Sequence, residues 1–173
     1  MKSTKCSRSA DLLWFACALA GGAIAQAQTT EVVLHNFETP PTGANPYAGV
    51  IRDAAGDLYG TTQHGGAANM GVIFKLDATG QETLLYTFTR GVDGGGPLAG
   101  VIHSGGNLYG TTYYGGALSA GVVFKLNITT GHETVLHSFR GGADGGNPRA
   151  AVVLDSAGNL VGGPDDHGTD DTF

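Results

Sequence analysis

Two aspartates in equivalent glycine-rich stretches are candidates for chemistry. Asp93 stands in TRGVDGGGP (residues 89–97) and Asp144 in RGGADGGNP (residues 140–148). A carboxylate and backbone carbonyl groups in such a loop can hold Ca²⁺, because calcium prefers oxygen ligands. An aspartate before glycine also caps a tight turn with its own side chain, and we favour this structural role. We therefore expect no cofactor and no metal ligand, with calcium as the alternative.

A second group of candidates lies in the same loops and their neighbours. Loops held by a rigid scaffold carry much of the function of repeat proteins, and exposed aromatic rings there can stack on a sugar ring. The alternative is that these residues are partly buried at strand ends. The predicted binding residues are His64, Asp93, Tyr113, Tyr114, Asp144 and Asn147. The predicted partner is a carbohydrate or a cell-surface protein.

Catalytic signatures are absent from the sequence. It contains neither the HExxH pattern of zinc enzymes nor the GxSxG turn of α/β-hydrolases. His35, Tyr86 and His137 occupy one repeated position, which we interpret as a packing site with a polar tip. We predict no catalytic residue. The alternative is an extracytoplasmic hydrolase or lyase that acts on a carbohydrate or a lactone.

The elements that position these side chains come from an internal repeat of about fifty residues. LYGTTQHGGAANMGVIFKL (residues 58–76) returns as LYGTTYYGGALSAGVVFKL (residues 108–126), with thirteen of nineteen positions identical. Four apolar runs separated by glycine-bearing turns predict four strands per unit. In the second unit we expect them at Leu98–His103, Asn107–Tyr113, Gly121–Asn127 and Glu133–Phe139.

The repeat predicts an all-β fold. A period of about fifty residues with four strands is typical of a β-propeller-like tandem repeat of four-stranded antiparallel blades. Full units are expected at about residues 47–88 and 98–139, with partial blade strands at 31–37 and 149–162. Gly60 and Gly110 are expected to let neighbouring sheets approach each other.

The motifs NLYGTT, GVVFKL, LHSF and DGGNP in the second unit resemble the GloVer tandem-repeat family. That resemblance covers nearly all of residues 31–162 and implies a secreted bacterial repeat protein, propeller-like, with no established reaction and no catalytic residues. The GNLYGT core also resembles blades of two-component-regulator and gluconolactonase-type propellers. After Leu160 the chain departs from the pattern and reads VGGPDDHGTDDTF.

The first 27 residues have the features of a signal peptide. Lys2, Lys5 and Arg8 precede the apolar run LLWFACALAGGAIA, and Ala25-Gln26-Ala27 is typical of a cleavage site. The repeat domain would then span residues 28–173, and the protein would be secreted or extracytoplasmic, without a stable membrane span. An uncleaved anchor and lipid attachment at Cys17 are the alternatives.

The mature chain is acidic. From residue 28 on, 6 Lys or Arg face 14 Asp or Glu, a net charge of −8. A nucleic-acid-binding protein needs a basic surface, so we predict no nucleic-acid partner.

Two full units and parts of a third fall short of the usual four or more blades. We therefore expect an incomplete ring or open arc that self-associates, or a fragment of a longer repeat protein.

Overall fold

The computed structural model describes residues 31–37, 42–162 and 171–172. The chain divides into two units, Met1–Val32 and Val33–Phe173, and the fold described below is that of the second. The predicted signal peptide lies outside the described residues.

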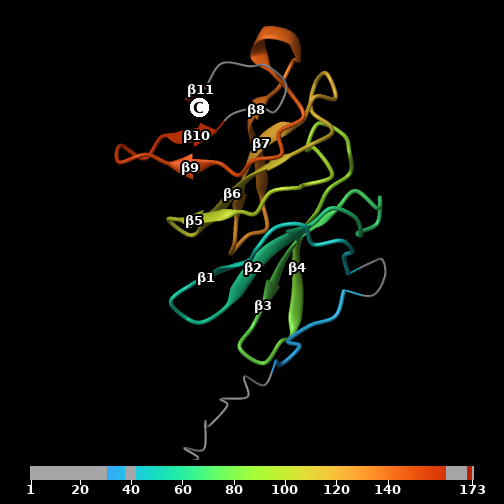
Figure 1. The fold of residues 1–173 in the computed structure, drawn as a ribbon, viewed down its shortest axis with the longest axis vertical. Coiled ribbons are helices and arrows are strands. Elements are labelled where there is room, and N and C mark those ends of the chain that lie inside the picture. Colours follow the sequence, from blue (N-terminus) through green and yellow to red (C-terminus); the bar gives the residue numbers. More distant parts are fainter. Residues whose placement is uncertain (1–30, 38–41, 163–170, 173) are drawn as a thin grey trace, which may run out of the picture. The chain divides into compact units, whose positions relative to one another are not determined.

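Two four-stranded antiparallel sheets form the body of this unit, and Figure 1 shows them one after the other along the chain. Both have the linear order expected of a meander. The first contains β1 (Ile51–Arg52), β2 (Leu58–Thr62), β3 (Val72–Leu76) and β4 (Glu82–Thr87). The second contains β5 (Ile102–Ser104), β6 (Asn107–Thr112), β7 (Val122–Asn127) and β8 (Glu133–Ser138). These sheets confirm the predicted all-β fold of repeated four-stranded units.

The first strand of the second unit is shorter than predicted. It was expected from Leu98, whereas β5 begins at Ile102. The preceding backbone contacts the first unit instead, because the Ala99 carbonyl accepts a hydrogen bond of 2.9 Å from Thr61 Oγ1.

A third sheet is smaller. It has the order β11-β10-β9, formed by β9 (Val153–Leu154), β10 (Leu160–Gly162) and β11 (Asp171–Thr172), and a short 3₁₀ turn, η1 (Gly142–Asp144), precedes it. We expected residues 31–37 to supply a strand here. Instead, this segment packs on the first sheet, where the Phe37 ring lies 4.8 Å from that of Phe74. The Phe88 and Phe124 rings repeat this arrangement at 5.3 Å.

Gly60 and Gly110 make room within a sheet rather than between sheets. A Cβ atom on Gly60 would lie 2.6 Å from Phe74 Cζ, and one on Gly110 would lie 2.8 Å from Phe124 Cζ. Each glycine pairs with that phenylalanine across the ladder. A β-bulge at the same phenylalanine in both units directs its ring across the glycine. The expectation that these glycines let neighbouring sheets approach is therefore replaced by a contact inside each sheet.

The repeated Gly-Thr-Thr triplet joins one unit to the next. Thr61 Oγ1 donates to the Ala99 carbonyl, and in the second unit Thr111 Oγ1 donates to the Ala150 carbonyl at 3.1 Å. The second threonine of each triplet closes its own loop, since Thr62 Oγ1 donates to His64 O at 2.7 Å. These hydroxyl groups are buried, so each bond satisfies a polar group that would otherwise be costly to bury.

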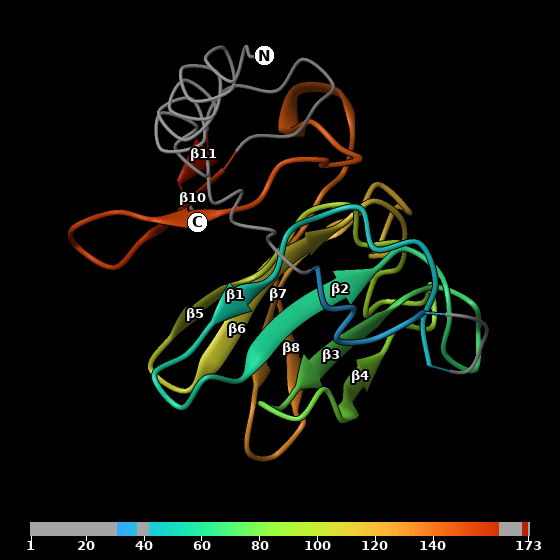
Figure 2. The ribbon, with the colours of Figure 1, turned by 60° about the horizontal axis from the view of Figure 1, so that its bottom comes forward.

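The hydrophobic core lies between successive sheets, which Figure 2 shows side by side. Residues of β7 alternate between two contacts: Val122, Phe124 and Leu126 pack toward the first sheet, while Val123 packs toward the third. The sheet formed by β5–β8 is thus apolar on both faces. This two-sided packing explains why its sequence lacks the apolar and polar alternation of a sheet with one solvent-facing side.

Candidate functional site

A pocket of about 460 Å³ lies where loops from successive units converge. Three of its lining residues follow the proline that precedes the first strand of each unit, and the others follow the Gly-Thr-Thr triplets. The lining residues are Tyr47, Leu98, Arg149, Gln63, Tyr113 and Tyr114. The pocket therefore collects the same two repeated positions from neighbouring units.

These positions differ between units whose scaffold is nearly constant. The residue after the conserved proline of this repeat is Tyr47, then Leu98, then Arg149, while the prolines themselves recur at 46, 97 and 148. Gln63 in the first unit corresponds to Tyr113 in the second. The scaffold fixes where these side chains stand, and their chemistry varies from unit to unit.

Three tyrosine rings and the guanidinium group of Arg149 are among the groups that line the pocket. The Tyr113 and Tyr114 rings meet edge to face with centroids 4.7 Å apart. Arg149 Cζ lies 5.2 Å from the Tyr113 ring centroid, and Arg90 Cζ lies 4.7 Å from that of Tyr114. Such cation–π contacts hold flexible arginine side chains in place. Tyr47 is 68% exposed and presents its ring to solvent.

The two predicted aspartates close turns. Asp93 is buried, and its carboxylate accepts hydrogen bonds from the Thr89 backbone N–H at 2.8 Å and from the Tyr86 hydroxyl at 3.3 Å. The Asp144 carboxylate accepts one from the Arg140 backbone N–H at 2.8 Å and lies 3.3 Å from His137 Nε2. These contacts support the turn-capping role, and calcium binding stays an untested alternative.

Asn147 and His64 also stand in loop contacts. Asn147 Nδ2 donates to the Tyr113 carbonyl at 2.8 Å, so it holds the backbone of a pocket residue. The backbone of His64 bridges to Ala44, as that of Tyr114 does to Gly95 in the next unit. Of the six predicted binding residues, Tyr113 and Tyr114 line the pocket, and Asn147 supports one of them.

Comparison with known families agrees with this repeat geometry. The model of the Gloeobacter/Verrucomicrobia repeat matches residues 20–173. The chain belongs to this family. The match confirms the resemblance seen in the sequence, and it covers both full units. No curated protein matches the chain.

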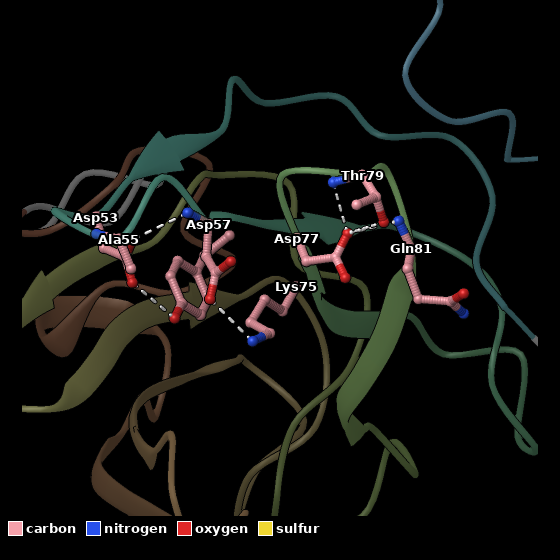
Figure 3. A network of polar contacts seen from close by, with 8 residues as sticks. Asp53, Ala55, Asp57, Lys75, Asp77, Thr79 and Gln81 are labelled. Atoms are coloured by element: carbon pink, nitrogen blue, oxygen red, sulfur yellow. Dashed lines mark hydrogen bonds and ion pairs between the residues drawn. The ribbon is translucent and has the colours of Figure 1, made fainter.

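Aspartates also begin the two tight turns of the first unit, as Figure 3 shows. Asp53 accepts hydrogen bonds from the backbone of Ala55 and Asp57, both at 2.9 Å, and Asp77 accepts one from that of Thr79 at 2.8 Å. Donors to the carboxylate favour its charged form, so the pKa of Asp77 is lowered. Lys75 Nζ contacts Asp57 at 2.9 Å and links the two turns. These hydrogen bonds close the turns at which Asp53 and Asp77 stand.

Partly buried carboxylates stand where one sheet meets the next. Glu82 lies 3.3 Å from His35 Nε2, and burial raises its pKa, an effect that the histidine charge opposes. At the equivalent junction Tyr86 replaces the histidine. Burial and then the charge of Asp93 raise the pKa of Glu133 from 4.5 to about 7. The repeat thus places a glutamate at each junction with different partners.

Within residues 31–37, 42–162 and 171–172, no cluster of three His, Cys, Asp or Glu side chains is arranged to hold a metal ion. The same part of the chain contains no helix long and apolar enough to cross a membrane.

Sequence reasoning missed four residues of the pocket, Tyr47, Gln63, Leu98 and Arg149. A signal for them existed. Aligning the units on their prolines and Gly-Thr-Thr triplets places these residues at positions that change while their neighbours are retained.

Proposed function

We propose that this protein is a non-catalytic binding module built from β-propeller-type blades, and that it holds a carbohydrate in the pocket lined by Tyr47, Tyr113 and Arg149. The observation that carries the proposal is the convergence of aromatic rings and an arginine from three successive units on one pocket.

The chemistry of the pocket suits a sugar. A sugar ring offers one apolar face of C–H groups and a rim of hydroxyl groups. The rings of Tyr47 and Tyr113 offer flat apolar surfaces with a polar tip, and Gln63 offers both a hydrogen-bond donor and an acceptor. Ligand pockets of a few hundred cubic ångströms with a few polar groups are typical binding sites.

The lining supports binding rather than hydrolysis. Glycoside hydrolysis generally requires two carboxyl groups that flank the scissile bond. None of the described residues that line the pocket carries a carboxyl group. The carboxylates nearest in sequence, Asp93 and Asp144, are engaged in closing turns.

Binding is tested by titrating oligosaccharides into the purified chain and into two variants, Tyr47→Ala and Tyr113→Ala. Removing a stacking ring should raise the Kd about tenfold, because an aromatic anchor contributes on the order of 1–2 kcal/mol. Tyr113→Phe should retain most of the affinity. Leu118→Ala, which alters an exposed loop residue outside the pocket lining, is the control. Equal affinities for all variants would place the ligand elsewhere.

We also propose that the protein is exported, on the strength of the basic start, apolar run and Ala25-Gln26-Ala27 in the sequence. Mass spectrometry of the exported protein should show a new N-terminus near Gln26 or Gln28. An intact protein that keeps Met1 and stays in the cytosol would contradict this.

A further inference from the structure

We propose that the pocket selects an acidic sugar, a uronate unit of a polysaccharide, whose carboxylate is bound by Arg149 while its ring lies against Tyr47 and Tyr113. This inference rests on the proposed function and adds the chemical class of the ligand.

The charge of the pocket differs in sign from that of the chain as a whole. The chain carries a formal net charge of −6, which disfavours anions in general. Yet the charged side chain among the described lining residues is an arginine. An arginine that lines a pocket in an acidic protein provides a local site for a negative group.

Arg149 is held in place by a neighbouring ring. Its guanidinium lies over the Tyr113 ring, with Cζ 5.2 Å from the ring centroid. A guanidinium carries five N–H donors in its plane. It can therefore donate hydrogen bonds to groups within the protein and to a ligand carboxylate at the same time. Its fork matches the two oxygens of a carboxylate, and stacking on a ring reduces the entropy lost when that fork is fixed.

The pocket is chemically asymmetric. One repeated position supplies a tyrosine from the first unit, a leucine from the second and an arginine from the third. A ligand therefore meets a flat ring, an apolar side chain and a cation on different sides. A uronate has matching parts: an apolar ring face and a carboxylate on its edge.

A second guanidinium extends the site. Arg90 stacks on Tyr114, which also lines the pocket, with its Cζ 4.7 Å from the ring centroid. The two stacked pairs, Arg149 on Tyr113 and Arg90 on Tyr114, lie on adjacent rings. This arrangement favours a chain with repeated carboxylates over a single acidic monosaccharide.

The experiment compares each acidic oligosaccharide with its own methyl ester, which has the same ring and no charge. The probes are oligomers of galacturonate, of alginate and of hyaluronan, titrated calorimetrically into the full chain purified after export. At least one acid should bind about tenfold more tightly than its ester, because a hydrogen bond to a charged group is stronger than one to a neutral group. Arg149→Gln should reduce that preference to about one, and Arg149→Lys should keep part of it.

Arg140→Gln is the matched control, because Arg140 is an exposed arginine that lines a different cavity. It should leave both affinities unchanged, and circular dichroism should show that all variants fold. Equal binding of acid and ester, or an acid preference that survives Arg149→Gln, would overturn the acidic-sugar inference while sugar binding itself stands. Binding of neutral oligosaccharides alone would do the same. No binding of any sugar would refute the proposed function, and the inference with it.

Discussion

Replacing Phe124 with alanine should lower the free energy of unfolding by about 3–5 kcal/mol, the usual cost of removing a buried phenylalanine. The Phe124 side chain is fully buried between the first and second sheets, against the ring of Phe88 and across the ladder from Gly110. The Phe124 ring lies over Gly110, and this glycine has no side chain that could fill the cavity left by the truncation. We therefore expect repacking to recover few of the lost contacts.

Chemical denaturation of the purified variant measures this loss. Leu136→Ala on β8 is the control, since that side chain is 42% exposed and its truncation should cost less than about 1 kcal/mol. Phe74→Ala tests the equivalent position in the first unit, where Phe37 supplies the covering ring. A similar loss at Phe74 and Phe124 is expected if residues 33–37 cover the first sheet as firmly as Phe88 covers the second. A loss below about 1 kcal/mol at Phe124 would contradict the packing described here.

The strands were predictable because their signal is local. The run from Val122 to Asn127 follows a glycine and became a strand close to its expected limits, and the repeated run from Val72 to Leu76 became its counterpart in the first unit. The roles of Thr61 and Gly60 were not predictable in this way. Their partners, Ala99 O and the Phe74 ring, are fixed by the stacking of units and by a bulge in the ladder, and neither appears in a local pattern.

Some residues of the candidate site were likewise predictable from local sequence, and others were not. Tyr113 and Tyr114 were identified from their residue type and loop position alone. Tyr47 and Arg149 are about one hundred residues apart in sequence and line one pocket, because equivalent loops of three units converge. For Asp93 and Asp144 the sequence left two roles open, because a turn-capping aspartate and a calcium ligand have the same local sequence. Only their hydrogen-bond partners distinguish the two roles.

The two junctions between sheets lie at equivalent positions of the repeat but have different charged and polar side chains. Position by position, His35, Thr42 and Glu82 at the first junction correspond to Tyr86, Asp93 and Glu133 at the second. At the first, His35 Nε2 lies 3.3 Å from a Glu82 oxygen. At the second, Glu133 shares its surroundings with another carboxylate, Asp93, whose charge adds to the effect of burial on the pKa of Glu133. The second junction therefore opposes ionisation of its glutamate.

The expected consequence is a loss of stability as the pH rises, which Glu133→Gln should remove. The pKa of Glu133 is raised from 4.5 to about 7 in the folded protein, chiefly by burial. Between these values the folded state holds a proton that the unfolded state has released, so stability falls as the pH increases from about 4.5 to 7. This difference between the pKa values of the unfolded and folded states corresponds to about 3 kcal/mol of stability. Because Glu133 is partly exposed to solvent, we expect the free energy of unfolding to fall by about 2 kcal/mol.

The measurement is the free energy of unfolding of the wild-type chain and of Glu133→Gln between pH 4 and pH 8. The difference between the two removes the contributions of other titrating groups, including the turn aspartates Asp53, Asp77 and Asp155, whose pKa values are lowered. Glu133→Gln should match the wild type at pH 4 and exceed it by about 2 kcal/mol at pH 8, because its amide never has to ionise.

Glu82→Gln is the matched control. Its gain should be smaller, since burial raises the pKa of Glu82 without the added charge of a second carboxylate such as Asp93. A difference that stays constant across this pH range would show that the Glu133 carboxyl titrates normally and that the second junction tolerates its charge.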